Sequence, residues 1–321
     1  MIVLNSAAHG QELRRHHFEE PVMGCTLRLE VFSPAEEQAV SAARDAVRRI
    51  KALERVLSDY DPDSESERLA LAGPGLHAAS PELLGMLAAA TALSVRSDGA
   101  FDVGCGALTR LWRQARRSGM APDANALLAA ASSSGWRKIR MDSKSMRAGL
   151  TDRAMRLDFG GIAKGHAVTE AARVLQLAGL GVHLVALDGD IALGAPPPGE
   201  RGWTVSMDPA PGRTEVATLE LAHCALSTSG DAFQHFDSGG ARLSHILDPR
   251  TGRPITRAVA VTVLAQDGLI ADSAATALCV AAPTERSRIA RRFGVAARLV
   301  ELDGAAPRVL TIGTWPISAV E

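Results

Sequence analysis

Hydrophobic positions near the start of the chain change from a two-residue period to a helical period. Residues 26–32 alternate polar and apolar side chains, which predicts a half-buried strand. Apolar residues then recur at steps of three, four and seven and predict one long amphipathic helix. These residues are Val40, Val47, Ile50, Leu53 and Leu57. Ser33 as N-cap, Pro34 in the first turn and Glu36 in a capping box predict where this helix begins.

The rest of the chain mixes short apolar runs with turn residues. A helix is expected from Pro81 to about Arg96, and others over 124–131, 164–177 and 271–281. Strands are expected over 136–141, between turns from 203 to 265, and twice near the C-terminus. Apart from the helix and the strand expected within it, the stretch 113–150 shows no regular pattern. Because hairpin-like strands mix with isolated helices, we predict an α+β fold with mixed or antiparallel sheets. We expect one large compact domain over residues 21–321, after a flexible polar segment of residues 1–20.

Composition excludes classes of protein that work through bulk charge or membrane spans. Lys plus Arg is 35 and Asp plus Glu is 36, so an anion site must be built locally and no nucleic-acid partner is expected. No apolar run reaches the ~18 residues of a membrane span, so we expect no stable membrane insertion. Residues 12–21 are too charged for a signal peptide. We expect a soluble cytoplasmic protein, with a periplasmic form left open if a leader was removed.

The strongest chemical signal lies in the segment from Leu157 to Gly165. A strand ends at Asp158, a glycine pair follows, and a helix begins with Lys164 in its first turn. Free backbone N–H groups, the helix dipole and the lysine charge all favour an anion such as a phosphate. The segment matches neither the Walker A loop nor the GxGxxG fingerprint. The alternative is a tight turn with an incidental lysine.

Two further segments carry side chains suited to acid–base or metal chemistry. His245 precedes the turn Asp248–Gly252 and is a candidate general base, because an ordinary histidine titrates near pH ~6.5. A strand histidine bonded to a carbonyl is the alternative. Asp272 and Thr276 are spaced i and i+4 on a predicted helix, so their oxygens suit Mg²⁺ or Ca²⁺. An N-capping aspartate with a helical threonine is the alternative.

Two weaker signals are a glycine-rich bend around Asp102 and the single tyrosine, Tyr60. The bend has the alternative of a plain loop. An aromatic ring beside a turn can stack on a planar heterocycle, and it can equally serve as a surface anchor.

Taken in chain order over residues 22–280, the sequence resembles the ApbE family of FAD:protein FMN transferases. The matching motifs are Met23-Gly24, Ser58-x-Tyr60-x-x-x-Ser64, Gly99-x-Phe101-Asp102, Leu111-Trp112, Asp158-x-Gly-Gly161-x-x-Lys164-Gly165, Gly189-Asp190, Thr228-Ser229-Gly230, His245-Ile246-x-Asp248-Pro249-x-Thr251-Gly252 and Ala271-Asp272 through Thr276. The resemblance implies an ApbE-like fold related to the T-fold.

The resemblance also implies a set of site residues. FAD, as a substrate, would bind through side chains or backbone of Met23, Tyr60, Ala100, Phe101, Asp102, Asp158, Lys164 and Ile246. A cation, Mg²⁺ or alternatively Ca²⁺, would be held by Asp272, Thr276 and the carbonyls of Gly161 and Ala275. His245 would take a proton during catalysis, and Asp272 could contribute. The partner would be an acceptor flavoprotein with a target threonine or serine, for which redox-pump subunits are the family's expected examples.

The implied reaction attaches FMN to the acceptor through a phosphoester and releases AMP. Two alternatives stay open at this point: metal-dependent hydrolysis of FAD to FMN and AMP, and a flavin-binding maturation factor without turnover. Tyr60 favours transfer, because an aromatic ring could shield the site from an extra metal ion or water.

The sequence departs from the family pattern at four places. Lys164-Gly165 is followed by His166 and Thr169 where the family usually has Tyr and Asp, and Asp188 replaces the first glycine of Gly-Gly-Asp. Ala232-Phe233 replaces a common Tyr and Glu. A specialised branch of the family or a different acceptor would explain these changes.

Overall fold

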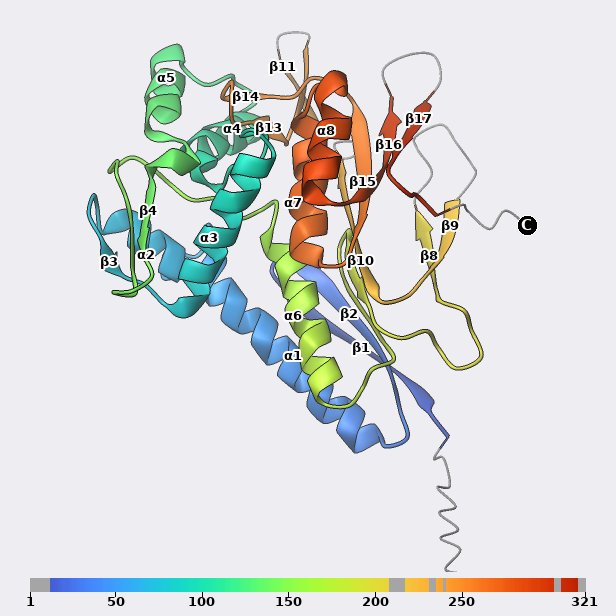
Figure 1. The fold of residues 1–321 in the computed structure, drawn as a ribbon. Coiled ribbons are helices and arrows are strands. Elements are labelled where there is room, and N and C mark those ends of the chain that lie inside the picture. Colours follow the sequence, from blue (N-terminus) through green and yellow to red (C-terminus); the bar gives the residue numbers. More distant parts are fainter. Residues whose placement is uncertain (1–11, 208–216, 231–234, 239–240, 303–306, 317–321) are drawn as a thin grey trace, which may run out of the picture.

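An eight-stranded antiparallel sheet forms the framework of the computed structural model, which describes residues 12–207, 217–230, 235–238, 241–302 and 307–316 (Figure 1). Each strand pairs antiparallel with its neighbour. In spatial order the strands are β1 (Arg14–Val22), β2 (Cys25–Ser33), β6 (His183–Leu187), β7 (Asp190–Leu193), β10 (Cys224–Gly230), β15 (Val259–Ala265), β16 (Ala296–Glu301) and β17 (Arg308–Ile312).

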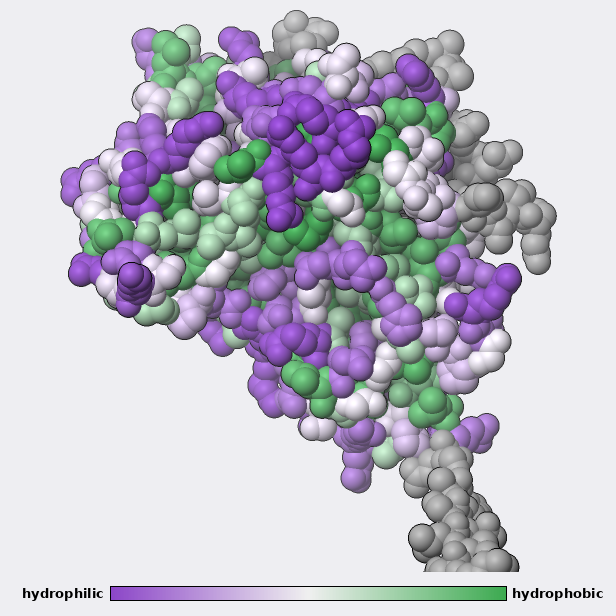
Figure 2. All heavy atoms as spheres, in the orientation of Figure 1, coloured by the Kyte–Doolittle hydropathy of each residue, from purple (hydrophilic) through white to green (hydrophobic). Residues whose placement is uncertain are grey.

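The two faces of this sheet are covered by different elements. One face packs against a row of helices, α1 (Glu36–Leu57), α6 (Ala163–Leu177), α7 (Gly268–Val280) and α8 (Pro283–Phe293), in which successive helices touch. The other face carries the hairpin of β8 (Trp203–Met207) and β9 (Ala217–Leu221). Alternation along β15 explains this division, because Val261 and Val263 join the main core whereas Leu264 packs with the hairpin. Figure 2 shows the arginine-rich outer side of α8 as a hydrophilic patch.

A second, smaller layer lies beside the large sheet (Figure 1). It contains the three-stranded sheet β3 (His77–Ala78), β5 (Arg147–Leu150) and β4 (Ile139–Asp142), with α2 (Glu65–Leu71), α3 (Pro81–Arg96), α4 (Gly106–Ser118) and α5 (Ala124–Ser133). Two short pairs follow later in the chain, β11 (His235–Ser238) with β12 (Ala241–Ser244), and β13 (Leu247–Asp248) with β14 (Arg253–Pro254). One hydrophobic cluster runs through both layers and includes Leu87, Leu157 and Val261. The predicted α+β fold is therefore confirmed.

Several predicted elements occur where the sequence placed them. α3 covers 81–96, and the Ser80 hydroxyl caps it by accepting from the backbone N–H of Leu83 at 3.1 Å. α5, α6 and α7 begin or end within about three residues of their predicted limits. Within the described residues, no helix combines the length and the apolar character that a membrane span requires.

The sequence predicts a flexible segment over residues 1–20. Residues 14–20 instead belong to the strand β1, and residues 1–11 lie outside the described part. β1 forms a hairpin with β2 through Met23 and Gly24, whose φ angles are 50° and 72°. Paired positive φ angles are typical of a two-residue hairpin turn. β1 lies at the edge of the sheet and carries mostly polar residues, so its composition gave no apolar signal.

The predicted start of the first helix is also wrong. Ser33 pairs with Arg14 as the last residue of β2, so its backbone belongs to the sheet and α1 begins at Glu36 without a side-chain cap. α4 and α8 were not predicted. Only Gly106, Leu108 and Ala115 of α4 are buried, so few apolar residues marked this helix in the sequence.

Candidate functional site

A cavity of about 1060 Å³ lies where the smaller layer meets the large sheet. Its volume is at the upper end of the range for small-molecule sites, which suits a dinucleotide-sized ligand. The cavity is lined by all the predicted site residues except Ala275. These are Met23, Tyr60, Ala100, Phe101, Asp102, Asp158, Gly161, Lys164, His245, Ile246, Asp272 and Thr276. The fold thus gathers segments that are far apart in sequence around one space.

The first turn of α6 brings Lys164 to the cavity beside α7. A Cβ atom on Gly165 would collide with the carbonyl of Gly268 and come within 2.6 Å of Asp272 Cβ. Glycine therefore lets the beginnings of α6 and α7 touch. The contact places Lys164 close to Asp272, although 108 residues separate them in sequence.

Two aspartates of the β6–β7 turn hold the Lys164 ammonium group. Its Nζ lies 2.8 Å from Asp188 Oδ2 and 3.8 Å from Asp190 Oδ2. Burial alone would lower the pKa of Lys164, but the attraction of Asp190 and Asp188 outweighs it and raises the pKa. Lys164 is therefore a permanent positive charge at the N-terminus of α6, where an anion is favoured.

Asp272, Thr276 and Gly161 form a compact group of oxygen atoms. Asp272 is buried, and its Oδ2 accepts a hydrogen bond from the Gly165 backbone N–H at 3.1 Å. The Thr276 hydroxyl lies 3.3 Å from the Ser229 hydroxyl. A Cβ atom on Gly161 would come 2.8 Å from Thr276 Oγ1, so only a glycine lets this backbone approach the hydroxyl. A carboxylate, a hydroxyl and a carbonyl are the donors that Mg²⁺ and Ca²⁺ prefer.

The charges around this group fit a divalent cation. Asp190 is 3% exposed, its Oδ1 is buried without a hydrogen-bond partner, and burial raises its pKa to about 6. Burial, and then Asp190, also raise the pKa of the Asp272 carboxyl. Two buried carboxylates beside one ammonium leave an excess of negative charge that a cation would offset. Among the described residues, no group of three His, Cys, Asp or Glu side chains is arranged to hold a metal ion.

Arg113 is a site residue that the sequence reasoning missed. It lies on α4 and lines the cavity. Its guanidinium pairs with Asp59 and with Asp158, the latter at 3.3 Å, and its Cζ lies 4.6 Å from the ring centroid of Tyr60. Arg113 thus fixes two predicted FAD-binding residues at once. Its neighbour Trp112 in the Leu-Trp motif was the available signal.

Two predicted binding residues have their polar atoms occupied by the protein itself. Asp102 accepts from the backbone N–H groups of Gly104 at 2.7 Å and Trp136 at 3.0 Å. The Ile246 N–H donates to Ser244 Oγ at 3.0 Å, and its carbonyl accepts from the Ile255 N–H at 3.0 Å. These contacts order the loops that carry Phe101 and His245. The role of Asp102 and Ile246 as direct ligands stays a prediction.

The other predicted residues differ in how they reach the cavity. Tyr60 is 75% exposed, so it lies at the mouth. His245 is exposed and occupies a bend between β12 and β13, whereas the sequence placed it in a strand. Ala275 is fully buried inside α7 and does not line the cavity, so its carbonyl stays a predicted ligand only.

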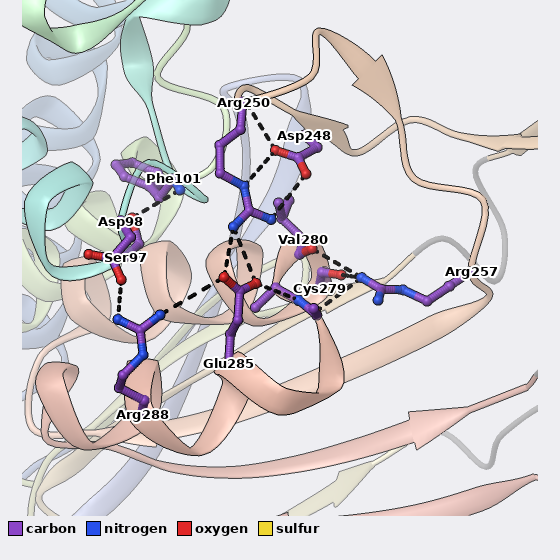
Figure 3. Close-up of polar contacts among 12 residues, drawn as sticks. Ser97, Asp98, Phe101, Asp248, Arg250, Arg257, Cys279, Val280, Glu285 and Arg288 are labelled. Atoms are coloured by element: carbon purple, nitrogen blue, oxygen red, sulfur yellow. Dashed lines mark hydrogen bonds and ion pairs between the residues drawn. The ribbon is translucent and has the colours of Figure 1, made fainter.

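A chain of ion pairs ties two walls of the cavity to α8 (Figure 3). Arg250, in the turn after His245, binds Asp248 at 3.0 Å and Glu285 at 3.2 Å. Arg288 joins Glu285, at 3.9 Å, to Asp98. Asp98 begins the loop that carries Ala100 and Phe101. The backbone N–H of Phe101 donates a hydrogen bond to Ser97 Oγ. Alternating charges therefore position the Phe101 loop and the His245 turn relative to each other.

Two of the departures from the family pattern, His166 and Thr169, contact residues that are far away in the sequence. His166 Nε2 lies 3.4 Å from Glu82 Oε1. The Thr169 hydroxyl accepts from the Gly268 N–H at 2.8 Å and donates to the Gly165 carbonyl at 3.1 Å, which supports the contact of α6 with α7. Ala232 and Phe233 lie outside the described residues.

Comparison with known sequences finds relatives that carry the same name. A relative from Rhodobacter capsulatus called FAD:protein FMN transferase is 32% identical over 284 residues, which are 87% of this chain and 54% of that protein. The chain thus spans only about half the length of that relative. A protein of the same name from Klebsiella pneumoniae is 27% identical over 88% of this chain and 83% of its own length.

Solved structures agree with the sequence matches. The apo form of the flavinyl transferase ApbE from Pseudomonas stutzeri superimposes with a TM-score of 0.83 at 30% identity, over 94% of this chain and 95% of that one. The flavin transferase ApbE from Vibrio cholerae gives a TM-score of 0.85 at 25% identity, over 94% and 98%. The model of the ApbE family matches residues 23–299. The chain belongs to the ApbE family.

Proposed function

We propose that this protein transfers FMN from FAD to a threonine or serine hydroxyl of an acceptor protein and releases AMP, with the help of a divalent cation. The observation that carries the proposal is that an anion site and a hard-oxygen site share one cavity. Lys164, at the N-terminus of α6, supplies the first, and Asp272 with Thr276 and Gly161 supplies the second. The names of the relatives described above support the same reaction.

The residues of the chain have separable roles in this reaction. The Lys164 ammonium, at the N-terminus of α6, binds the FAD diphosphate. Tyr60 and Phe101 contact the flavin and adenosine parts, and Arg113 fixes Tyr60. The acceptor hydroxyl attacks the phosphorus of the FMN half. A new P–O bond forms, the bond to the bridging oxygen breaks, and AMP leaves with that oxygen. His245 takes the hydroxyl proton.

Asp272, Thr276 and the Gly161 carbonyl would hold the cation, and Mg²⁺ is the form we propose. When bound, it would neutralise charge on the diphosphate. Asp272 contributes a ligand and is a poor base for that reason, so the proton goes to His245 in our proposal. Ca²⁺ is the alternative, because both ions take oxygen donors.

A turnover assay tests the proposal. Purified protein is mixed with FAD, Mg²⁺ and an acceptor domain from a covalent flavoprotein, and AMP release and acceptor mass are followed. We expect AMP release together with an acceptor mass gain of one FMN. The variant His245→Gln should lose at least about a hundredfold in rate. His77→Gln serves as the matched control. His77 lies in β3, away from the cavity, and its Nε2 is hydrogen-bonded to the Gly73 carbonyl.

The other outcomes separate the alternatives. AMP release without a mass gain on any acceptor would favour an FAD hydrolase. FAD binding without AMP release would favour a flavin-binding maturation factor, and the transferase proposal would then be wrong.

A further inference from the structure

The turn between β6 and β7 places a carboxylate at an unusual backbone position beside the proposed diphosphate site. Asp188 has a φ of 57°, a region that side chains other than those of Gly, Asn and Asp seldom adopt. The family pattern usually has glycine here, as noted above. The turn is short, because Leu187 and Asp190 already pair with each other. The Asp188 side chain is 59% exposed and lines the cavity.

Asp188 makes the shortest ion pair with Lys164. Its Oδ2 lies 2.8 Å from the Lys164 Nζ, whereas Asp190 Oδ2 lies 3.8 Å away. Asp190 and Asp272 are buried, so their side chains are fixed parts of the site. Asp188, by contrast, is largely solvated and reaches the ammonium from the turn. An ammonium has only three donors, so each acceptor from the protein leaves fewer for a phosphate.

We propose that Asp188 competes with the FAD diphosphate for the Lys164 ammonium and so weakens the binding of diphosphate ligands. The inference rests on the proposed role of Lys164 as the diphosphate-binding lysine. A carboxylate oxygen at 2.8 Å occupies a position on the ammonium that a phosphate oxygen needs. The diphosphate must displace or share this contact, and it also meets the repulsion of the Asp188 charge. Asp188 therefore acts as a residue that sets affinity.

Calorimetric titration of three ligands tests this role. FAD and ADP both carry a diphosphate, whereas riboflavin carries no phosphate. In Mg²⁺ buffer at low salt, Asp188→Asn should bind FAD and ADP about five- to tenfold more tightly than the wild type. Riboflavin binding should not change. The gain should shrink at high salt, because the exposed Asp188 charge is screened. Initial rates should show a lower KM and a higher kcat/KM for FAD, since the diphosphate is present in both the ground state and the transition state and both gain from the change.

Two controls isolate the contact from the backbone. Asp188→Gly removes the same carboxylate and should give the same gain. Met146→Gly relieves another positive φ, of 52°, in a turn outside the cavity and should leave FAD affinity unchanged. In a Lys164→Met background, the gain from Asp188→Asn should largely disappear, because the two groups act through one contact.

Three results would overturn the inference. Weaker or unchanged FAD and ADP binding by Asp188→Asn would show that the carboxylate orients Lys164 or does nothing. An equal gain for riboflavin, or a gain that persists without Lys164, would exclude competition at the ammonium. A wild type that binds ADP but not FAD would contradict the proposed function, while the ADP measurements would still decide the role of Asp188.

Discussion

Replacing Arg113 by methionine tests whether this side chain holds one wall of the cavity together. The side chains of Arg113, Asp59 and Asp158 are 22%, 10% and 12% exposed, so the three charges are mostly shielded from water. Burial, and then Asp158, raise the pKa of the Asp59 carboxyl even with the arginine present. Without the guanidinium, the two carboxylates face each other with no cation between them.

The expected cost follows from this burial. Removing one partner of a buried ion pair costs about 3 to 5 kcal/mol, and the partial exposure of Arg113 favours the lower end. The contact with the Tyr60 ring adds about 0.5 to 1 kcal/mol. We therefore expect Arg113→Met to lose about 3.5 to 4 kcal/mol of unfolding free energy. FAD affinity should fall about tenfold, because Tyr60 and Asp158 lose the group that positions them.

Urea unfolding and FAD titration measure the two effects, with the midpoint read at unchanged slope. Arg116→Met is the matched control, because Arg116 lies three residues further along α4 and also lines the cavity. Arg113→Lys should fall between the two, since a lysine keeps the charge but cannot bridge both carboxylates. If Arg113→Met were as stable as the control and bound FAD equally well, the positioning role would be refuted.

Three further predictions concern charge. Asp272→Asn should stabilise the metal-free protein by about 1 kcal/mol in thermal melts, because it removes one of two buried like charges. Mg²⁺ should no longer raise the Tm of this variant. An unchanged response of the Tm to Mg²⁺ would contradict the proposed cation site. Glu285→Gln should cost at most about 1 kcal/mol, and molar salt should abolish the difference. Burial would raise the pKa of Glu170, but hydrogen bonds from two arginines outweigh it and hold the pKa at about 2 instead of 4.5. Because this pKa is depressed, the stabilisation that the Glu170 carboxylate provides is complete above about pH 4.5 and is lost as the pH falls to about 2. Glu170→Gln should flatten the acid unfolding profile over that interval.

The features read correctly from the sequence depend on neighbours a few residues apart. The apolar spacing predicted most of α1, and Ser80-Pro81 predicted where α3 begins. The glycine pair before Lys164 predicted where α6 begins, and the i, i+4 spacing put Asp272 and Thr276 on one side of α7. The backbone alone connects these residues, so period, caps and turns determine their geometry.

Where an element has little local signal, the sequence reasoning failed. β1 is an edge strand of mostly polar residues, and only its pairing with β2 makes it a strand. Ser33 looked like a helix cap but belongs to that same pairing. Sheet pairing outweighs a local capping preference, because the backbone groups of Ser33 are already committed.

By itself, the sequence determined the family, the α+β class and twelve of the residues that line the cavity. Only the tertiary structure decided which of these residues touch. It joins Arg113 to Asp59 and Asp158, and it leaves a buried oxygen of Asp190 unpartnered. It also pairs Lys164 with Asp188. These partners are 24 to 54 residues apart in the chain. Sheet register and helix packing bring them together, and no local period encodes either.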